Sequence, residues 1–200
     1  MNNSAQKPGL RERKRRETLQ RITDTGLKLF LSQGYEETTL DAIAEASGIS
    51  RRTFFYYFKS KEEILLAWQS GTGAAIAAAI QEQTADKAPI DAVLDAILSL
   101  ASQFDANELV AIERLLRSTE ELRASKHAKY VQQEGAVFEA LCAKWPQARR
   151  RDSLRLIAMA SMGALRLAVD RWVEEGTKRP LAKHLRETFE SLKAELGRQS

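Results

Sequence analysis

The sequence predicts an all-α protein with an N-terminal three-helix helix-turn-helix domain, a larger C-terminal helical domain and about nine helices in total. Two observations favour helices: only 4 Pro and 10 Gly interrupt the 200 residues, and β-branched runs are few although 44% of the residues are hydrophobic. A third is the stretch TTLDAIAEASGISRRTFFYYF at residues 38–58, which has the pattern of two short helices joined by a tight turn.

Both short helices have suitable residues at their ends. Thr39 can cap the first by accepting from a backbone N–H group, and Gly48 can adopt the left-handed conformation that ends it. Ser50 can cap the second, in which Phe54 and Phe58 share the face that would pack inward. The outward face then holds cations, hydroxyls and aromatic rings: Arg51, Arg52, Thr53, Phe55, Tyr56 and Tyr57. This combination suits a recognition helix in the major groove of DNA.

The chemistry of these side chains predicts separate roles. Arg51 and Arg52 can bond guanine edges or phosphates, and Thr53 can contact a thymine methyl group or a phosphate. Tyr56 and Tyr57 are expected to hold phosphates, because a phenol offers one hydroxyl and a broad apolar face.

Together with LKLFLSQGYEETT before it and KSKEEILLAW after it, the stretch resembles the DNA-binding domain of TetR-family transcriptional repressors. The resemblance covers about Arg15 to Gly71 and includes, in order, F-x-x-x-G-Y, T-T-x-x-x-I-A-x-x-x-G-I-S, T-F-F-Y-Y-F and K-S-K-E-E. It implies that Thr38 and Thr39 lie where a helix N-terminus meets a phosphate. Members of the family often carry tyrosine where this chain has Phe55, whose role is then limited to apolar contact.

Charge is concentrated at the same end of the chain. Residues 1–21 hold seven basic and two acidic side chains, whereas the net charge of the whole chain is only +4. Such a distribution favours a polyanion as partner. The segment from Arg11 to Arg16 is either an arm that reaches phosphates or a minor groove, or a solvated first turn of the helix expected over about residues 15–32. Residues 1–9 are expected to be mobile.

A long helix should follow, running from about Lys61, whose ammonium is expected to anchor a phosphate, into the Ala-rich segment at residues 74–80. Ser60 precedes it as the expected cap. In the family that the chain resembles, this helix links the DNA-binding domain to a larger effector-binding and dimerisation domain. Gly71 and Gly73 are unfavourable inside a helix and could bend or break it.

The remaining sequence is a succession of helical patterns from Pro89 onward, with a break at Trp145-Pro146. This region is expected to hold the effector pocket. Its conspicuous polar and aromatic candidates, each of which could equally be a surface or packing residue, are Glu113, Arg114, His127, Tyr130 and Trp145. The segment from about Leu109 to Trp172 weakly resembles the C-terminal domains of actinobacterial-type TetR regulators linked to fatty acyl or acyl-CoA ligands, and its apolar helices would suit a drug-like hydrophobe equally well.

The last two helical patterns, at about residues 152–175 and 181–196, are rich in small and apolar residues. Helices of this kind can form a four-helix bundle with their two-fold mates, as they do in the resembling family, or can merely close the protomer's own core. We expect a dimer, because one recognition helix reads too few bases. The interface is predicted to include Leu165, Trp172, Leu181, Leu185, Phe189 and Leu192.

Three classes of function follow. The leading prediction is a ligand-responsive repressor that binds a pseudo-palindromic operator as a homodimer; the second is an enzyme, and the third a ligand-independent DNA-binding protein. Two His residues, no Gly-rich phosphate loop and no clustered metal ligands argue against an enzyme, a cofactor or a metal. One Cys and the lack of a long apolar run favour the cytoplasm. The predicted domains are a flexible arm (1–10), a DNA-binding domain (11–71) and an effector-binding and dimerisation domain (72–200).

Overall fold

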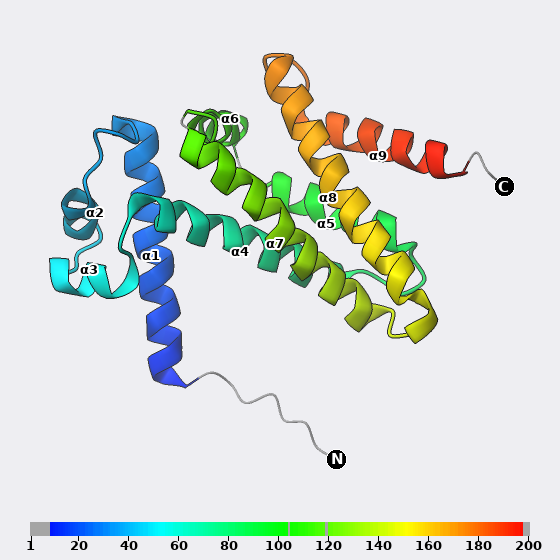
Figure 1. The fold of residues 1–200 in the computed structure, drawn as a ribbon, viewed down its shortest axis with the longest axis horizontal. Helices are drawn as coiled ribbons and strands as arrows, with labels where there is room; N and C mark the ends of the chain where they lie inside the picture. The colour runs from blue at the N-terminus through cyan, green and yellow to red at the C-terminus, as the bar shows by residue number, and fades with distance from the viewer. Residues whose placement is uncertain (1–8, 104, 119, 198–200) are drawn as a thin grey trace. The chain divides into compact units, whose positions relative to one another are not determined.

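The computed structural model describes residues 9–103, 105–118 and 120–197, apart from the side chains of residues 69, 70, 108, 121, 124–129 and 196. Within these residues the chain forms nine α-helices and no strand (Figure 1), which confirms the predicted all-α class. The chain divides into two compact units, Met1–Trp68 and Gln69–Ser200, called unit 1 and unit 2 below. The predicted domain limits remain predictions, and most of the expected mobile arm lies outside the described residues.

Unit 1 contains α1 (Leu10–Gln33), α2 (Leu40–Ala46), α3 (Arg51–Tyr57) and the first turns of α4 (Lys61–Glu82). Each helix contributes to one apolar core, formed by Ile22, Leu27, Phe30, Ile43, Ala44, Phe54, Phe58, Ile64 and Leu65. α1 and α4 approach closely because Gly26 lacks a side chain: a Cβ there would lie 2.9 Å from Cγ2 of Ile64.

The first helix begins five residues earlier than the predicted start at about residue 15. The segment from Arg11 to Arg16 is therefore helical, not an extended arm. Ion pairs one turn apart, Glu12 with Arg16 at 3.3 Å and Arg13 with Glu17 at 3.4 Å, support these added turns.

α4 is continuous, so neither Gly71 nor Gly73 breaks it as the sequence had allowed. Its start is capped as predicted, because Ser60 Oγ accepts from the backbone N–H of Glu63 at 3.3 Å. By length and composition alone, α4 is also the one helix among the described residues that could cross a membrane. Four of its apolar side chains are instead buried inside the two units: Ile64, Leu65, Ile76 and Ile80.

Unit 2 contains the rest of α4 and five further helices, of which the first begins at the predicted Pro89 and the last two match their predicted limits to within one residue. They are α5 (Pro89–Ala101), α6 (Ala106–Leu115), α7 (Glu120–Lys144), α8 (Arg151–Glu174) and α9 (Leu181–Gly197). A short 3-10 turn, Ala148–Arg150, follows the predicted break at Pro146.

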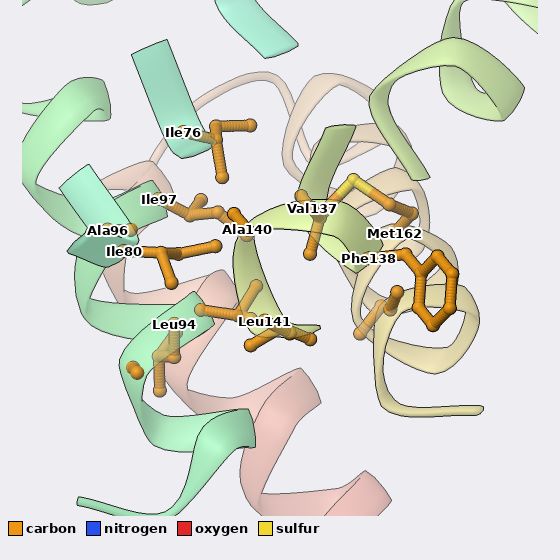
Figure 2. Packing of buried hydrophobic residues seen from close by; sticks show 14 of the residues in the cluster. Ile76, Ile80, Leu94, Ala96, Ile97, Val137, Phe138, Ala140, Leu141 and Met162 are labelled. Atoms are coloured by element: carbon orange, nitrogen blue, oxygen red, sulfur yellow. The ribbon is translucent and has the colours of Figure 1, made fainter. Parts of the chain in front are cut away.

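Figure 2 shows the apolar core of unit 2, where side chains from four helices meet. Ile76 and Ile80 from α4 point toward Ile97 of α5 and Leu141 of α7, and Met162 of α8 lies at one side. α9 completes the core with two fully buried side chains, Leu185 and Phe189. Helices with apolar faces on more than one side need several covering partners, which explains this arrangement.

α7 and α8 pack against each other in antiparallel directions. Glu134 pairs with Arg155 at 3.8 Å, and Glu139 pairs with Arg151 at 3.9 Å, so residue numbers rise along α7 as they fall along α8. Both guanidinium groups also lie 4.8 Å from the ring centroid of Phe138.

A tight turn joins α8 to α9. Gly176 and Thr177 have φ angles of 68° and 60°, in the left-handed region. Polar contacts hold the turn: His184 Nε2 lies 3.0 Å from Glu175 Oε2, and Trp172 donates from Nε1 to the backbone oxygen of Arg179 at 3.0 Å.

Candidate nucleic-acid interface

α2 begins and ends as the sequence predicts. Thr39 Oγ1 accepts from the backbone N–H of Ala42 at 3.1 Å, which satisfies one of the unpaired donors of the first turn. After α2, Gly48 adopts a φ of 66°, and the N–H of Ile49 donates to the oxygen of Ala44 at 3.1 Å. This is the left-handed helix ending that lets the chain turn sharply into α3.

α3 is fixed at both its start and its inner face. Ser50 Oγ accepts from the N–H of Thr53 at 3.2 Å and therefore caps the helix. Phe54 and Phe58 are 0% and 3% exposed, and their ring centroids lie 6.1 Å apart. Because these rings lie in the core, the helix can present only its opposite side to a partner.

That opposite side carries the predicted contact residues. Arg51, Arg52 and Thr53 are exposed, and Tyr56 is 71% exposed. Arg51 Nε lies 3.1 Å from Asp41 Oδ1 of α2, and its guanidinium lies over the ring of Phe55. An exposed pair of this kind contributes little to stability, so a phosphate can compete with Asp41 for the guanidinium. The sequence analysis did not identify Asp41, although its place in the first turn of α2 puts a carboxylate next to α3.

The two remaining rings of α3, Phe55 and Tyr57, differ in their exposure to solvent. Phe55 is 37% exposed, which leaves its apolar edge open to contact. Tyr57 is partly buried, and its ring lies 5.2 Å from that of Tyr56 in an edge-to-face arrangement.

Two residues proposed from the sequence as DNA contacts have internal partners. Thr38 is 1% exposed, and its hydroxyl donates to the oxygen of Gly34 at 2.7 Å. Lys61 Nζ donates to the backbone oxygens of Tyr35 at 2.7 Å and Glu36 at 3.3 Å. These contacts tie the α1–α2 connection to α4, so both side chains serve the unit's own structure.

Tyr35 reinforces the same connection, as its packing role in the sequence analysis anticipated. Its hydroxyl donates to Glu62 Oε1 at 2.5 Å, and its ring lies 4.4 Å from Lys61 Nζ. Partial burial raises the pKa of Glu62, but the hydrogen bonds from Tyr35 and Ser60 outweigh it and leave that pKa below its usual value.

The residues predicted for the effector pocket do not form one group in unit 2. Trp145 is buried in the core and donates from Nε1 to the oxygen of Ala85 at 3.0 Å, which is a packing role. Arg114 is exposed. The side chain of His127 lies outside the described residues.

Glu113 and Tyr130 belong instead to a polar cluster between α6, α7 and α8. Arg117 Nη2 donates to Asp170 Oδ1 at 2.6 Å, and its Nε lies 4.0 Å from Glu113 Oε2. Burial raises the pKa of the Tyr130 hydroxyl, and the charges of Glu113 and Asp170 raise it further. Arg117 and Asp170 were missed from the sequence, because no local motif connects residues so far apart in the chain.

The residues predicted for the dimer interface lie in the protomer's own core. Trp172, Leu185 and Phe189 are at most 1% exposed, and the other three are partly buried against that core: Leu165, Leu181 and Leu192. The three buried residues take the role of closing the protomer's own core, because both helices turn their most apolar faces inward, and the interface role of the other three remains a prediction.

A different apolar face of α8 is exposed. Leu156, Met159 and Leu167 are 66%, 49% and 55% exposed, and Gly163 lies between them. Their spacing places all four on one side of the helix, opposite the buried side. This face, called the α8 stripe below, was hidden in the sequence because α8 is apolar on two sides.

A short capped helix that exposes cations, hydroxyls and phenols, and that follows another helix across a glycine turn, defines the class of helix-turn-helix DNA-binding proteins. Two family models match the chain: the tetR family of bacterial regulatory proteins at residues 22–68, and the MftR C-terminal domain at residues 87–197. The chain belongs to the TetR family of transcriptional regulators.

Individual relatives agree with this assignment. The chain is 35% identical over 145 residues to the regulator TcmR of Streptomyces glaucescens, which covers 68% of this chain and 64% of TcmR. It is 30% identical over 122 residues to the putative mycofactocin biosynthesis regulator MftR of Mycobacterium tuberculosis, which covers 59% of this chain and 61% of MftR. The match thus spans less than two thirds of either relative.

Among solved structures, the chain is similar to FadR of Thermus thermophilus, a TetR-family repressor in complex with lauroyl-CoA. The TM-score is 0.60 at 25% identity, over 86% of this chain and 91% of FadR. The family and these relatives are transcriptional regulators, not enzymes.

Proposed function

We propose that this protein is a repressor that binds a pseudo-palindromic operator as a homodimer in the cytoplasm and leaves it when a small hydrophobic effector binds unit 2. The observation that carries the proposal is the outer face of α3, where Arg51, Arg52, Thr53 and Tyr56 are exposed while Phe54 anchors the helix. Guanidinium groups can bond guanine edges, and hydroxyls can hold phosphates.

The proposed DNA contacts are those predicted residues that the described structure leaves at the surface. On α3 and its cap they are Ser50, Arg51, Arg52, Thr53, Phe55, Tyr56 and Tyr57. Thr39 is added at the N-terminus of α2, where exposed backbone N–H groups favour a phosphate. Thr38 and Lys61 would act indirectly, by holding the chain between α1 and α2 in place.

We propose the α8 stripe as the centre of the dimer interface. A two-fold dimer places two recognition helices about 34 to 36 Å apart, one turn of DNA, and thereby reads two half-sites. Leu156, Met159 and Leu167 supply exposed apolar surface, and Gly163 permits close approach of a second helix.

A fatty acyl chain or its CoA thioester is the proposed effector. Its support is the similarity to FadR, which was crystallised with lauroyl-CoA, and the supply of apolar side chains from five helices inside unit 2. An effector can shift α4 only if it binds one arrangement of the helices more tightly than the other.

The alternative is a DNA-binding protein that needs no ligand. The burial of the apolar side chains of unit 2 favours it, because a ligand would have to displace side chains that now cover one another.

The test is selection of bound duplexes from a random library, followed by titration of the selected duplex with lauroyl-CoA. The repressor proposal expects a two-fold symmetric site and release of the duplex by the ligand. A symmetric site with no release by any compound would favour the ligand-independent alternative. Recovery of no preferred sequence would reject both.

A further inference from the structure

Three buried side-chain atoms in unit 2 have no hydrogen-bond partner among the residues that the structure describes, and two of them, unlike Nε of Arg117, also have no ion-pair partner there. These two are Oε1 of Gln133, a residue that is 2% exposed, and Oγ of Ser161, which is 0% exposed. A serine inside a helix ordinarily bonds the carbonyl four residues earlier, and Ser161 does not. Each such group costs about 1–3 kcal/mol unless something pairs with it, so a functional explanation is warranted.

Both residues border the apolar core. Gln133 lies one turn before Val137 on the inward face of α7, and Ser161 lies between Ala158 and Leu165 on the inward face of α8. Figure 2 shows Val137 near the middle of that core. An apolar ligand that entered this core would lie against the faces of α7 and α8 that carry these two side chains.

Gln133 also touches the helix that both units share. A Cβ added at Gly73 of α4 would lie 3.3 Å from Cγ and 3.4 Å from Cα of Gln133. The stem of Gln133 is thus held against the backbone of α4, and its amide is the end that can respond to a ligand. A hydrogen bond between a ligand and this amide would therefore act on a side chain that directly contacts α4.

We infer that Gln133 and Ser161 select an effector that carries a hydroxyl group on its apolar part, such as a hydroxylated fatty acyl chain. This inference rests on the proposed function and narrows its ligand class. Gln133 Oε1 accepts a hydrogen bond from the hydroxyl of the ligand, and Ser161 Oγ can donate or accept one. A plain alkyl chain leaves both atoms unpaired, and a site built to hydrogen-bond a hydroxyl rejects the ligand that lacks it.

The test compares three probes: lauroyl-CoA, 3-hydroxylauroyl-CoA and 12-hydroxylauroyl-CoA. Calorimetry on the full chain gives their affinities, and release of the selected duplex gives their effect. We expect one hydroxylated compound to bind at least about tenfold more tightly than lauroyl-CoA, which is the worth of one net hydrogen bond. Gln133→Leu and Ser161→Ala should each reduce this preference to about threefold or less and leave duplex binding unchanged.

Val137→Ala is the matched control, because it removes apolar contact beside Gln133 and should weaken all three compounds alike. Equal binding of the three compounds to the wild-type chain would reject the inference and leave the proposed acyl effector in place. Failure of all three to bind would reject that effector and the inference together.

A separate measurement excludes a buried water as the partner of these atoms. In the ligand-free protein, Gln133→Leu should leave the melting temperature unchanged or raise it, since an unpaired polar group is replaced by an apolar one. A clear fall for both Gln133→Leu and Ser161→Ala would mean that the atoms are already satisfied within the folded chain, and would overturn the inference.

Discussion

The two units use polar side chains in opposite ways. In unit 1 the polar groups proposed to bind DNA lie on the surface, and the only polar side chains buried among its described residues are small hydroxyls: Thr23, Thr38 and Ser47. In unit 2 the notable polar groups are buried: Glu113, Gln133, Ser161 and His184 are all at most 7% exposed. A DNA duplex is large and must be met at a surface, whereas a small effector can be enclosed. The difference in burial thus corresponds to a difference in the size of the partner.

The largest expected effect comes from a substitution in the apolar core of unit 2. Leu185→Glu should place an unpaired carboxylate in the core and destabilise the protein by at least about 4 kcal/mol, because the carboxylate loses its hydration and the leucine its packing. Circular dichroism should show loss of helix or a strongly lowered melting temperature. Leu185→Met keeps the volume and should remain folded. A folded, monomeric Leu185→Glu protein would contradict this and restore Leu185 to the dimer interface.

The second largest effect is expected from a substitution on the α8 stripe, at the surface of the same unit. Leu167→Glu places the same charge on the α8 stripe, where the residue is 55% exposed, so the protomer should stay folded. Sedimentation should show the dimer shifted to monomer at micromolar concentration, because two carboxylates would meet across the two-fold axis.

Val131→Glu on α7 is the control for Leu167→Glu, since Val131 is 67% exposed and outside the stripe. It should remain dimeric. If Leu167→Glu and Val131→Glu had the same proportion of dimer, the α8 stripe would not be the interface.

The contrast between Leu185 and Leu167 also shows where sequence reasoning reached its limit. Local signals predicted the helices well: the caps Thr39, Ser50 and Ser60 and the turn at Gly48 all form as expected. A cap depends on neighbours within three or four residues, which a sequence displays directly.

Which face of α8 or α9 turns inward depends on helices far away in the chain. α8 is apolar on two sides, and its sequence does not reveal which side the protomer covers itself. The pairing of Arg117 with Asp170, 53 residues apart, was equally out of reach. Thr38 is a different case, since the oxygen of Gly34 that accepts from its hydroxyl lies only four residues earlier.

In unit 1 the next prediction concerns a substitution on the exposed face of α3, which should affect DNA binding and leave stability unchanged. Arg52→Ala should weaken binding to the selected duplex by about 1–3 kcal/mol, roughly five- to 150-fold, with an unchanged melting temperature. Fluorescence anisotropy at fixed salt measures the change. Arg186→Ala removes the same charge from an exposed site of α9 and should bind as the wild type does. If both variants bind equally, the recognition face is not the outer side of α3.

The smallest effect tests the turn that joins α8 and α9. The hydrogen bond with His184 and the contact with Arg179 lower the pKa of Glu175 below its usual value of 4.5. A carboxylate with a lowered pKa in the folded state contributes stability above its unfolded pKa and loses it as the pH falls through the folded value.

Glu175→Gln should therefore be slightly less stable than the wild type at pH 6, and the difference should vanish below the folded pKa. Thermal melts between pH 6 and pH 3 measure this, with Glu174→Gln as the exposed control on the same helix. A difference that stayed constant from pH 6 to pH 3 would mean that the carboxylate acts through packing and not through its charge, and that this part of unit 2 is held by shape alone.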